Sequence, residues 1–251
     1  DREKKLTRIF KKIFSKNSYV HIPETIDKLS TKRLLTMSWL EGNPILNFKN
    51  SKKEIRNKIA KNMFYTWYKP FYEYGIIHGD PHLGNYTIQS NYSINLFDFG
   101  CMRIFKGKFI QGVIDLYFAL QKNDTEKAVH AYTQWGFTDI NKKKLDVLNK
   151  WAEFVYSPLM KDKTQKIQES ESGVYGAKIA AEVHKELKKL GGIKPPKEFV
   201  FMDRAAVGMG SVFMHLKAEV NWYQFFHSLI ENFDQKKMNL KQQNALKLVN
   251  L

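Results

Sequence analysis

Two short stretches of the sequence decide the fold: IIHGDPHLGNYTI (residues 76–88) and INLFDFG (residues 94–100). In each stretch an apolar run adjoins a cluster of carboxylate, amide and glycine residues. Turn-forming residues at 90–92, including Asn91, separate the two stretches. We therefore predict short strands near 76–78, 86–89 and 93–97, the last two paired as a hairpin that brings the polar clusters face to face.

The spacing of the polar residues points to phosphoryl transfer. That chemistry needs a carboxylate that orients the nucleophile, and an amide and a second carboxylate that hold Mg²⁺ against the phosphates. Protein-kinase-like folds supply these groups from the patterns His-x-Asp-x-x-x-x-Asn and Asp-Phe-Gly. Here the first pattern is made by His78, Asp80 and Asn85, and the second begins at Asp98. The apolar run before each cluster agrees with this interpretation.

Other interpretations of the same residues are weaker. His78, Asp80 and His82 could ligate zinc or iron, but that leaves Asn85 and the Asp-Phe-Gly run unexplained. His82 is open between a hydrogen-bonding loop residue and a catalytic one. The run AVGMGSVF (206–213) looks like a phosphate-binding loop, yet it lies inside a helical pattern. We interpret Gly208 and Gly210 as sites of close helix packing.

Most of the remaining chain has the spacing of amphipathic helices. A basic helix is expected over 2–15, followed by a hairpin that pairs 25–29 with 33–39. The next helix is expected to begin at a capping box of Ser51 and Glu54, to bend at Pro70 and to end at Gly75. A polar tail from Asp234 is expected to dock loosely or to fray. Beyond residue 105 we expect helices near 107–121, 125–135, 142–156, 174–190, 197–216 and 219–233.

The composition limits the class of protein. The 251 residues are 43% hydrophobic, carry a net charge of +16 and include one cysteine, so the chain is globular and forms no internal disulfide. The basic pairs are scattered without interleaved aromatic residues, so we expect no specific nucleic-acid binding. No apolar run reaches the roughly 18 residues of a spanning helix and no signal peptide is visible. We expect a cytoplasmic chain and leave peripheral attachment to an anionic membrane open.

On these motifs the sequence resembles the UbiB/AarF family of atypical protein-kinase-like proteins, which is linked to coenzyme Q biosynthesis. HGDPHLGN (78–85) is similar to the family's catalytic loop, and LFDFGCM (96–102) to its metal loop. VHIPETIDKLSTKRLLTMSWLEG (20–42) is similar to the segment that leads into the interlobe hinge. FMDRAAVGMGSVFMHLKAEVNW (201–222) is similar to the C-terminal helical signature. The resemblance thus covers most of the chain.

The resemblance implies a kinase-like fold that binds ATP and Mg²⁺, with a role for each matching residue. Asp80 would be the catalytic carboxylate, with His78 beside it in the catalytic loop. Asn85 and Asp98 would be the Mg²⁺ ligands. The other cofactor contacts would come from the hinge and the metal loop, namely Met37, Ser38, Trp39, Leu40, Phe99 and Gly100.

Departures from the family pattern matter as well. Leu83 stands where the family usually has proline, and Gly79 stands where many protein kinases carry arginine. The family's lysine-glutamine motif, its alanine-rich loop and the strand lysine that pairs with a helix glutamate are not found in these residues. Glu3 is a candidate for that glutamate. The sequence resembles a family member without most of its N-lobe, so we expect residues 1–251 alone to bind nucleotide poorly.

Together these observations predict an α+β, protein-kinase-like fold with a partial N-lobe and hinge (1–42), a mostly helical C-lobe with a small catalytic β-hairpin (43–233) and a polar tail (234–251). The expected function is that of an ATP- and Mg²⁺-dependent atypical kinase or ATPase that supports ubiquinone metabolism. A small-molecule phosphotransferase of the aminoglycoside or choline kinase kind stays open, as does a non-catalytic scaffold. The expected partners are a nucleotide and, less specifically, an anionic membrane surface, a lipid or a quinone intermediate; the sequence leaves a protein partner open.

Overall fold

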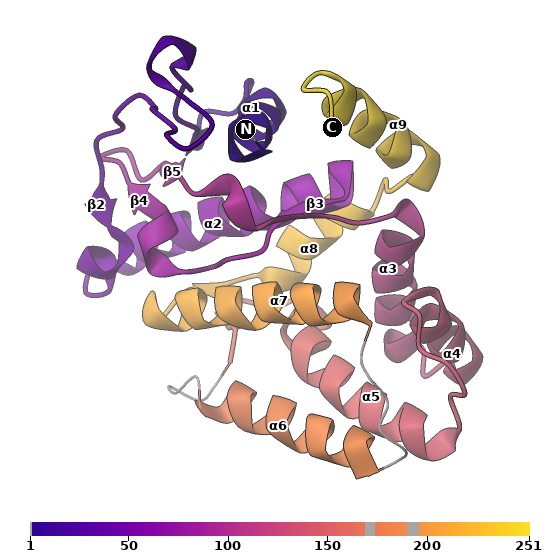
Figure 1. The fold of residues 1–251 in the computed structure, drawn as a ribbon. Helices are drawn as coiled ribbons and strands as arrows, with labels where there is room; N and C mark the ends of the chain where they lie inside the picture. The colour runs from indigo at the N-terminus through magenta and orange to yellow at the C-terminus, as the bar shows by residue number, and fades with distance from the viewer. Residues whose placement is uncertain (1, 169–173, 190–195) are drawn as a thin grey trace.

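The computed structural model describes residues 2–168, 174–189 and 196–251, and it has the expected mixed α+β, mostly helical character (Figure 1). The strands are β1 (Val20–His21), β2 (Asn43–Pro44), β3 (Ile76–His78), β4 (Tyr86–Ile88), β5 (Ile94–Leu96), β6 (Met102–Ile104), β7 (Gln165–Lys166) and β8 (Glu219–Val220). The α-helices are α1 (Arg2–Ile13), α2 (Lys53–Tyr74), α3 (Gly107–Gln121), α4 (Thr125–Gln134), α5 (Lys142–Tyr156), α6 (Val174–Lys189), α7 (Lys197–His215), α8 (Trp222–Ile230) and α9 (Gln235–Lys247).

The strands that carry the polar clusters form two small sheets beside α2. The larger has the order β1-β5-β4-β2, and its β4–β5 pair is the predicted hairpin, with Tyr86 opposite Leu96 and Ile88 opposite Ile94. The smaller pairs β3 antiparallel with β6, placing His78 opposite Met102. Strand β6 was not predicted from the sequence. Because it returns beside β3, it fixes the metal loop next to the catalytic loop.

Helix α2 supports both sheets. Its buried residues recur at helical spacing, among them Ile59, Met63 and Trp67, and they face the strands and the helical lobe. The helix ends at Gly75, whose φ of 63° allows its N–H to cap the last turn, as predicted. The predicted capping box is wrong. Ser51 donates its N–H to Phe48 and completes the preceding turn, so the helix begins two residues later, at Lys53.

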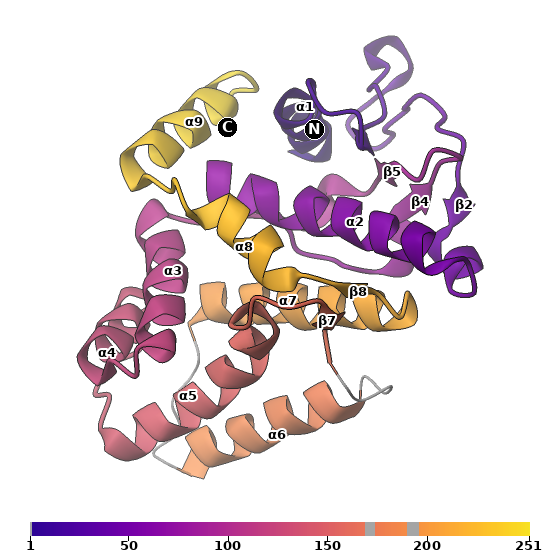
Figure 2. The same cartoon turned by 180° about the vertical axis from the view of Figure 1, so that it is seen from behind.

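The helical lobe lies on the other side of α2. Helix α7 lies between the strand-containing half and the α5–α6 pair, and α8 crosses α2 (Figures 1 and 2). The helices predicted beyond residue 105 are confirmed, except that the one expected at 219–233 is shorter. Glu219 and Val220 pair with β7, and the Asn221 side chain then caps α8, so this helix begins at Trp222. The predicted boundary of α6 at residue 190 lies outside the described residues.

Two further expectations differ from the structure. The segment expected to pair 25–29 with 33–39 does pair, through an antiparallel bridge between Thr25 and Met37, but Asp27–Leu29 form a 3₁₀ turn instead of a strand. The tail expected to dock loosely or to fray contains α9, which packs against α2 and α3. Gln242 on α9 donates to the carbonyl oxygens of Tyr74 and Phe105, which explains why this polar helix is held. None of the helices in the described ranges is long and apolar enough to cross a membrane.

Candidate functional site

The catalytic loop is closed by hydrogen bonds around Asp80. The Asn85 side-chain N–H donates to Asp80 Oδ2 at 3.0 Å and to the Asp80 carbonyl oxygen at 3.2 Å. The second carboxylate oxygen, Oδ1, accepts the N–H of His82 at 3.3 Å. Asn85 is buried, whereas Asp80 is partly exposed. The loop therefore presents a carboxylate of fixed orientation, and it leaves Asn85 Oδ1 for a cation.

His78 links the catalytic loop to the metal loop. Its Nε2 lies 3.0 Å from the carbonyl oxygen of Phe97, and its Nδ1 accepts the N–H of Asp80 at 3.3 Å. Burial lowers the pKa of His78, and the nearby backbone carbonyls and carboxylates only partly oppose that shift. A neutral ring with the proton on Nε2 satisfies both contacts. His78 is thus a positioning residue that connects Asp80 to the residue preceding Asp98.

The metal loop has an unusual backbone at Asp98. This residue adopts φ 52° and ψ 79°, in the left-handed region, and its Oδ1 accepts the N–H of Gly100 at 3.2 Å. Asparagine and aspartate tolerate this region better than other non-glycine residues because their short side chains bond to the local backbone. The turn (η4, Phe99–Cys101) then leads into β6. The loop is therefore held in a sparsely populated backbone conformation, as is common at functional sites.

Short backbone contacts hold the two loops together. The Phe97 N–H donates to the Asn85 carbonyl at 2.8 Å, and the Gly79 N–H donates to the Cys101 carbonyl at 3.2 Å. A Cβ atom at Gly79 would lie 2.5 Å from that same oxygen. The position that many protein kinases fill with arginine therefore requires glycine here, because the two loops approach too closely for a side chain.

The structure also brings Glu3 to the metal loop. Helix α1 packs against η4, with the ring of Phe10 5.3 Å from that of Phe99. A Cβ atom built at Gly100 would lie 4.0 Å from Glu3 Oε2, so the carboxylate of Glu3 faces the glycine of the Asp-Phe-Gly run. From the sequence Glu3 was only a candidate. Its position at the edge of the metal loop makes it the third carboxylate of this region.

The remaining predicted site residues lie in two different environments. Trp39 is 81% exposed and donates its indole N–H to Glu41, while Met37, Ser38 and Leu40 are partly buried beside it. The Glu41 carbonyl accepts from Asn95 on β5, which places the hinge exit against the catalytic hairpin. Phe99 is fully buried between Phe10 and His78, so it supports the metal loop from below, whereas Gly100 is exposed. The nucleotide contacts assigned to these residues stay predictions.

One contact was missed by the sequence interpretation. A Cβ atom at Gly208 on α7 would lie 2.1 Å from Cγ of Pro81, the residue after Asp80. Close packing at Gly208 is confirmed, and its partner is the catalytic loop. Close packing at Gly210 is wrong, because a Cβ atom there would have no described residue within 4 Å outside its own helix backbone. The spacing of the two glycines could not separate these environments, since only one of them faces Pro81.

The donor set of the site fits a hard cation. Asp98 offers a carboxylate and Asn85 an amide oxygen, and oxygen ligands are what Mg²⁺ prefers. Within the described part of the chain, no group of three or more histidine, cysteine, aspartate or glutamate residues could hold a metal ion. Mg²⁺ sites of kinases commonly rely on one or two protein side chains plus the substrate phosphates. The residues present therefore suit a cation that arrives with a phosphate ligand.

Comparisons with known proteins give a family and a set of relatives. The family described as the ABC1 atypical kinase-like domain matches residues 1–132. An uncharacterized protein in the hydrogenase 1 5′ region of Clostridium pasteurianum is 24% identical over 216 residues, which are 84% of this chain and 38% of that protein. The mitochondrial atypical kinase COQ8B of Rattus norvegicus is 24% identical over 157 residues, which are 59% of this chain and 30% of that protein. The chain thus spans well under half the length of these relatives.

A solved structure gives the same answer for the fold. Rv3197 from Mycobacterium tuberculosis, solved in a complex with erythromycin, superposes with a TM-score of 0.65 at 17% sequence identity. The match covers 90% of this chain and 56% of that chain. The predicted protein-kinase-like fold is confirmed.

Proposed function

Because the chain belongs to the ABC1 atypical kinase-like family, we propose that it is an ATP- and Mg²⁺-dependent atypical kinase or ATPase that supports ubiquinone metabolism. The observation that carries this proposal is the arrangement around His78. Its two ring nitrogens contact the backbone of Asp80 and of Phe97, which precedes Asp98. One buried side chain thereby holds together a candidate proton acceptor and a candidate metal ligand.

Each residue has a separate part in the proposal. The Asp80 carboxylate, fixed by Asn85, orients the attacking hydroxyl group or water and accepts its proton. The Asp98 carboxylate and Asn85 Oδ1 would hold Mg²⁺, and the bound Mg-ATP supplies the phosphoryl group. Glu3, whose carboxylate lies beside Gly100, is proposed as the helix glutamate that pairs with a lysine of the phosphate site.

That phosphate-site lysine is not identified within residues 1–251, which limits what this chain does by itself. The lysine that holds the α- and β-phosphates contributes much of the nucleotide affinity in kinase-like folds. We therefore propose that residues 1–251 bind Mg-ATP weakly and that activity belongs to the whole protein. Tight, stoichiometric binding of Mg-ATP to residues 1–251 in calorimetry would contradict this part of the proposal.

The acceptor is proposed to be water, a small molecule or a lipid and not a peptide. Gly79 replaces the arginine that pairs with a phosphorylated activation loop in many kinases, and α3 begins at Gly107, soon after the metal loop. This leaves little chain for a peptide-docking platform. A strong protein-kinase activity of the whole protein, lost in Asp80→Asn, would overturn this preference.

The direct test is the Mg²⁺ dependence of nucleotide binding. ADP or ATP is titrated into the chain with Mg²⁺ or with EDTA, and weak binding is followed by NMR chemical-shift changes. We expect Mg²⁺ to strengthen nucleotide binding to the wild type. In Asp98→Asn we expect this Mg²⁺-dependent gain in affinity to be at least tenfold smaller. The matched control is Asp146→Asn on the exposed surface of α5, which should behave as the wild type. An equal Mg²⁺ effect in Asp98→Asn and wild type would sink the proposal.

The metabolic part is tested in cells. Replacing the gene by an Asp80→Asn allele should lower the ubiquinone content as much as deleting the gene, because both remove the proposed proton acceptor. A normal ubiquinone content in the deletion strain would remove the link to quinone metabolism and leave the nucleotide-binding proposal standing.

A further inference from the structure

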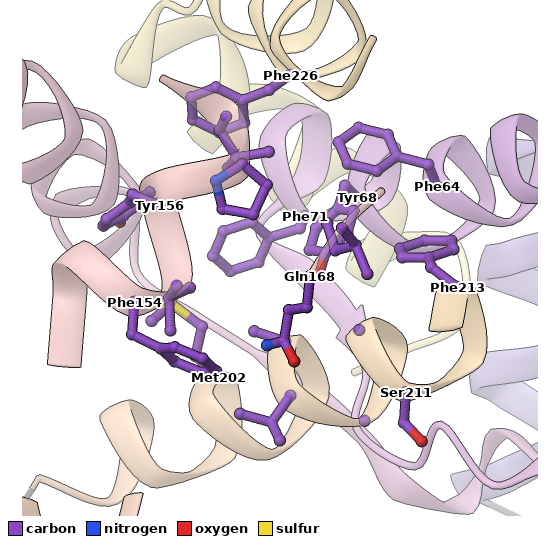
Figure 3. A pocket seen from close by; sticks show the side chains of 18 of the residues that line it. Phe64, Tyr68, Phe71, Phe154, Tyr156, Gln168, Met202, Ser211, Phe213 and Phe226 are labelled. Atoms are coloured by element: carbon purple, nitrogen blue, oxygen red, sulfur yellow. The ribbon is translucent and has the colours of Figure 1, made fainter. Parts of the chain in front are cut away.

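The helical lobe contains a cavity of about 310 Å³ that the proposed phosphoryl chemistry does not use. It lies among α2, α5, α7 and α8, as Figure 3 shows. This volume is at the lower end of the range for small-molecule pockets, roughly 300–1,000 Å³. The residues that enclose it come from all four helices and include Phe64, Phe71, Tyr156, Met202, Phe213 and Phe226.

The lining is apolar but contains two polar groups that have no hydrogen-bond partner among the described residues. Gln168 reaches across the cavity toward α7 (Figure 3), and its Oε1 is buried without a hydrogen-bond partner in the described part of the chain. Tyr68 on α2 also lines the cavity, and its hydroxyl forms no hydrogen bond with any described residue. Burial raises the pKa of Tyr68 well above its ordinary value, so the hydroxyl stays neutral.

An unpartnered buried acceptor is uncommon because it loses its hydrogen bonds to water on folding. A ligand with a hydrogen-bond donor would restore one of these bonds. The described residues that line the cavity include no charged side chain, so a charged ligand would be desolvated without compensation from them. The chemistry of the walls thus selects a neutral molecule.

The cavity also shares residues with the back of the catalytic loop. Ile77 on β3 lines it and directly precedes His78. Gly208 on α7 lines it as well and packs against Pro81, the residue after Asp80. A molecule inside the cavity would therefore touch both elements that position the catalytic loop.

We propose that this cavity is a binding site for a neutral, mostly apolar and partly aromatic small molecule that donates one hydrogen bond to Gln168 Oε1. The aromatic walls provide dispersion and edge-to-face contacts for such a ligand, and Gln168 fixes its orientation. The site is separate from the nucleotide site, and its test does not depend on phosphoryl transfer.

The probe for the test is N-phenyl-1-naphthylamine, which is neutral and aromatic and has one N–H donor. It is titrated into the whole 251-residue chain, and its fluorescence in apolar surroundings reports binding. We expect saturation with one probe per chain. Fluorescence that rises linearly without saturation would overturn the proposal.

Two cavity-filling substitutions test whether the probe binds in the cavity. Gly210 lines it, and a Cβ atom there meets nothing within 4 Å, so Gly210→Leu should fill part of the space. Ala206→Met fills it from the previous turn of α7. Each should weaken probe binding at least tenfold, whereas the matched control Gly210→Ala should stay within about twofold of the wild type. Wild-type affinity in both filling variants would overturn the proposal.

The hydrogen bond is tested with a matched pair of probes. N-methyl-N-phenyl-1-naphthylamine lacks the donor, so we expect it to bind the wild type roughly threefold to tenfold more weakly. Gln168→Leu should remove that preference by removing the acceptor. If circular dichroism shows that the filling variants do not fold, this measurement by itself decides whether the probe binds in the cavity beside Gln168. A preference that survives in Gln168→Leu would contradict the assigned donor site.

Discussion

The catalytic loop and the apolar cavity both contact α7 at Gly208, but their buried polar groups differ in whether they have hydrogen-bond partners. In the loop, both ring nitrogens of His78 and the side-chain N–H of Asn85 have partners. In the cavity, Gln168 Oε1 and the Tyr68 hydroxyl have none among the described residues. The positions of His78 and of the Asn85 amide N–H are thus fixed before a ligand arrives and Asn85 Oδ1 is left for a cation, whereas the cavity holds polar atoms that await a partner.

This difference has a thermodynamic meaning. A fully paired polar network stabilises one geometry, which suits residues that must hold a carboxylate at a fixed angle. An unpaired buried acceptor lowers stability by roughly 1–3 kcal/mol until something bonds to it. Substitutions in the loop should therefore cost stability, and removal of the unpaired atom in the cavity should increase it.

The largest effect is expected at His78. The side chain is 1% exposed and lies 4.9 Å from the ring of Trp67 and 6.1 Å from that of Phe99. His78→Ala leaves a void and removes the partners of the Phe97 carbonyl and the Asp80 N–H. We expect a loss of about 3–4 kcal/mol in the free energy of unfolding, measured in urea.

The control for this variant is His82→Ala in the same loop. His82 is exposed, and among the described residues its side chain accepts only the N–H of Gly84, so its removal should cost less than about 1 kcal/mol. Equal losses in the two variants would show that His78 does not hold the loops together. The claim that paired polar groups stabilise the catalytic loop would then be wrong.

The second effect is expected at Gly208, where the two regions meet. Gly208→Ala places a Cβ atom 2.1 Å from Pro81 Cγ, so α7 or the catalytic loop must move. We expect a loss of about 2 kcal/mol in urea unfolding and weaker Mg²⁺-dependent nucleotide binding. Gly210→Ala is the matched control in the same helix, and it should gain up to about 1 kcal/mol from helix propensity. Similar changes in both variants would contradict the close contact between Gly208 and Pro81.

The two glycines also show where sequence reasoning reaches its limit. The catalytic hairpin and nearly all helices could be predicted, because spacing and periodicity are local properties of the chain. What separates Gly208 from Gly210 is the position of Pro81, more than 120 residues away in sequence. Strand β6 was missed for a related reason, since Met102–Ile104 become a strand only by pairing with β3.

In the candidate site, too, some features could be predicted from local spacing and others depend on tertiary packing. Asp80, Asn85 and Asp98 follow from motif spacing, but the link through His78 depends on which carbonyl lies opposite its Nε2. The contact of Glu3 with the metal loop depends on how α1 packs against η4. The cavity could not be predicted from the sequence, because most of its walls come from four helices whose aromatic residues have the spacing of ordinary core residues.

A third effect concerns pH and a carboxylate on α7. Burial raises the pKa of Asp203 to about 6, although the Trp151 indole N–H donates to its Oδ1 at 2.9 Å and opposes the shift. The folded chain then holds this proton more tightly than the unfolded chain, so stability falls as pH rises from about 4 to about 6. A shift of about two units corresponds to about 3 kcal/mol, and for a partly exposed side chain we expect about 1–2 kcal/mol.

The measurement compares urea unfolding of the wild type and Asp203→Asn across pH 4–7. His78 has the opposite sign, because its pKa is lowered by burial and stability is lost as pH falls below about 6.5. The difference between the two proteins cancels the His78 contribution and isolates Asp203. A difference that does not change with pH would show that this carboxyl titrates normally and that the interior of the helical lobe is more hydrated than its apolar walls suggest.

The smallest effect tests the second half of the comparison. Gln168→Leu removes the buried Oε1 that has no partner in the described residues and keeps a side chain of similar size. We expect the free energy of unfolding to rise by up to about 1 kcal/mol. Gln165→Leu is the control three residues earlier, where Nε2 donates to the Pro158 carbonyl at 2.9 Å, and it should lose about 1 kcal/mol. Opposite signs are the decisive result, because both substitutions exchange an amide for the same apolar group, and the Gln165 amide has a hydrogen bond whereas Gln168 Oε1 has none among the described residues.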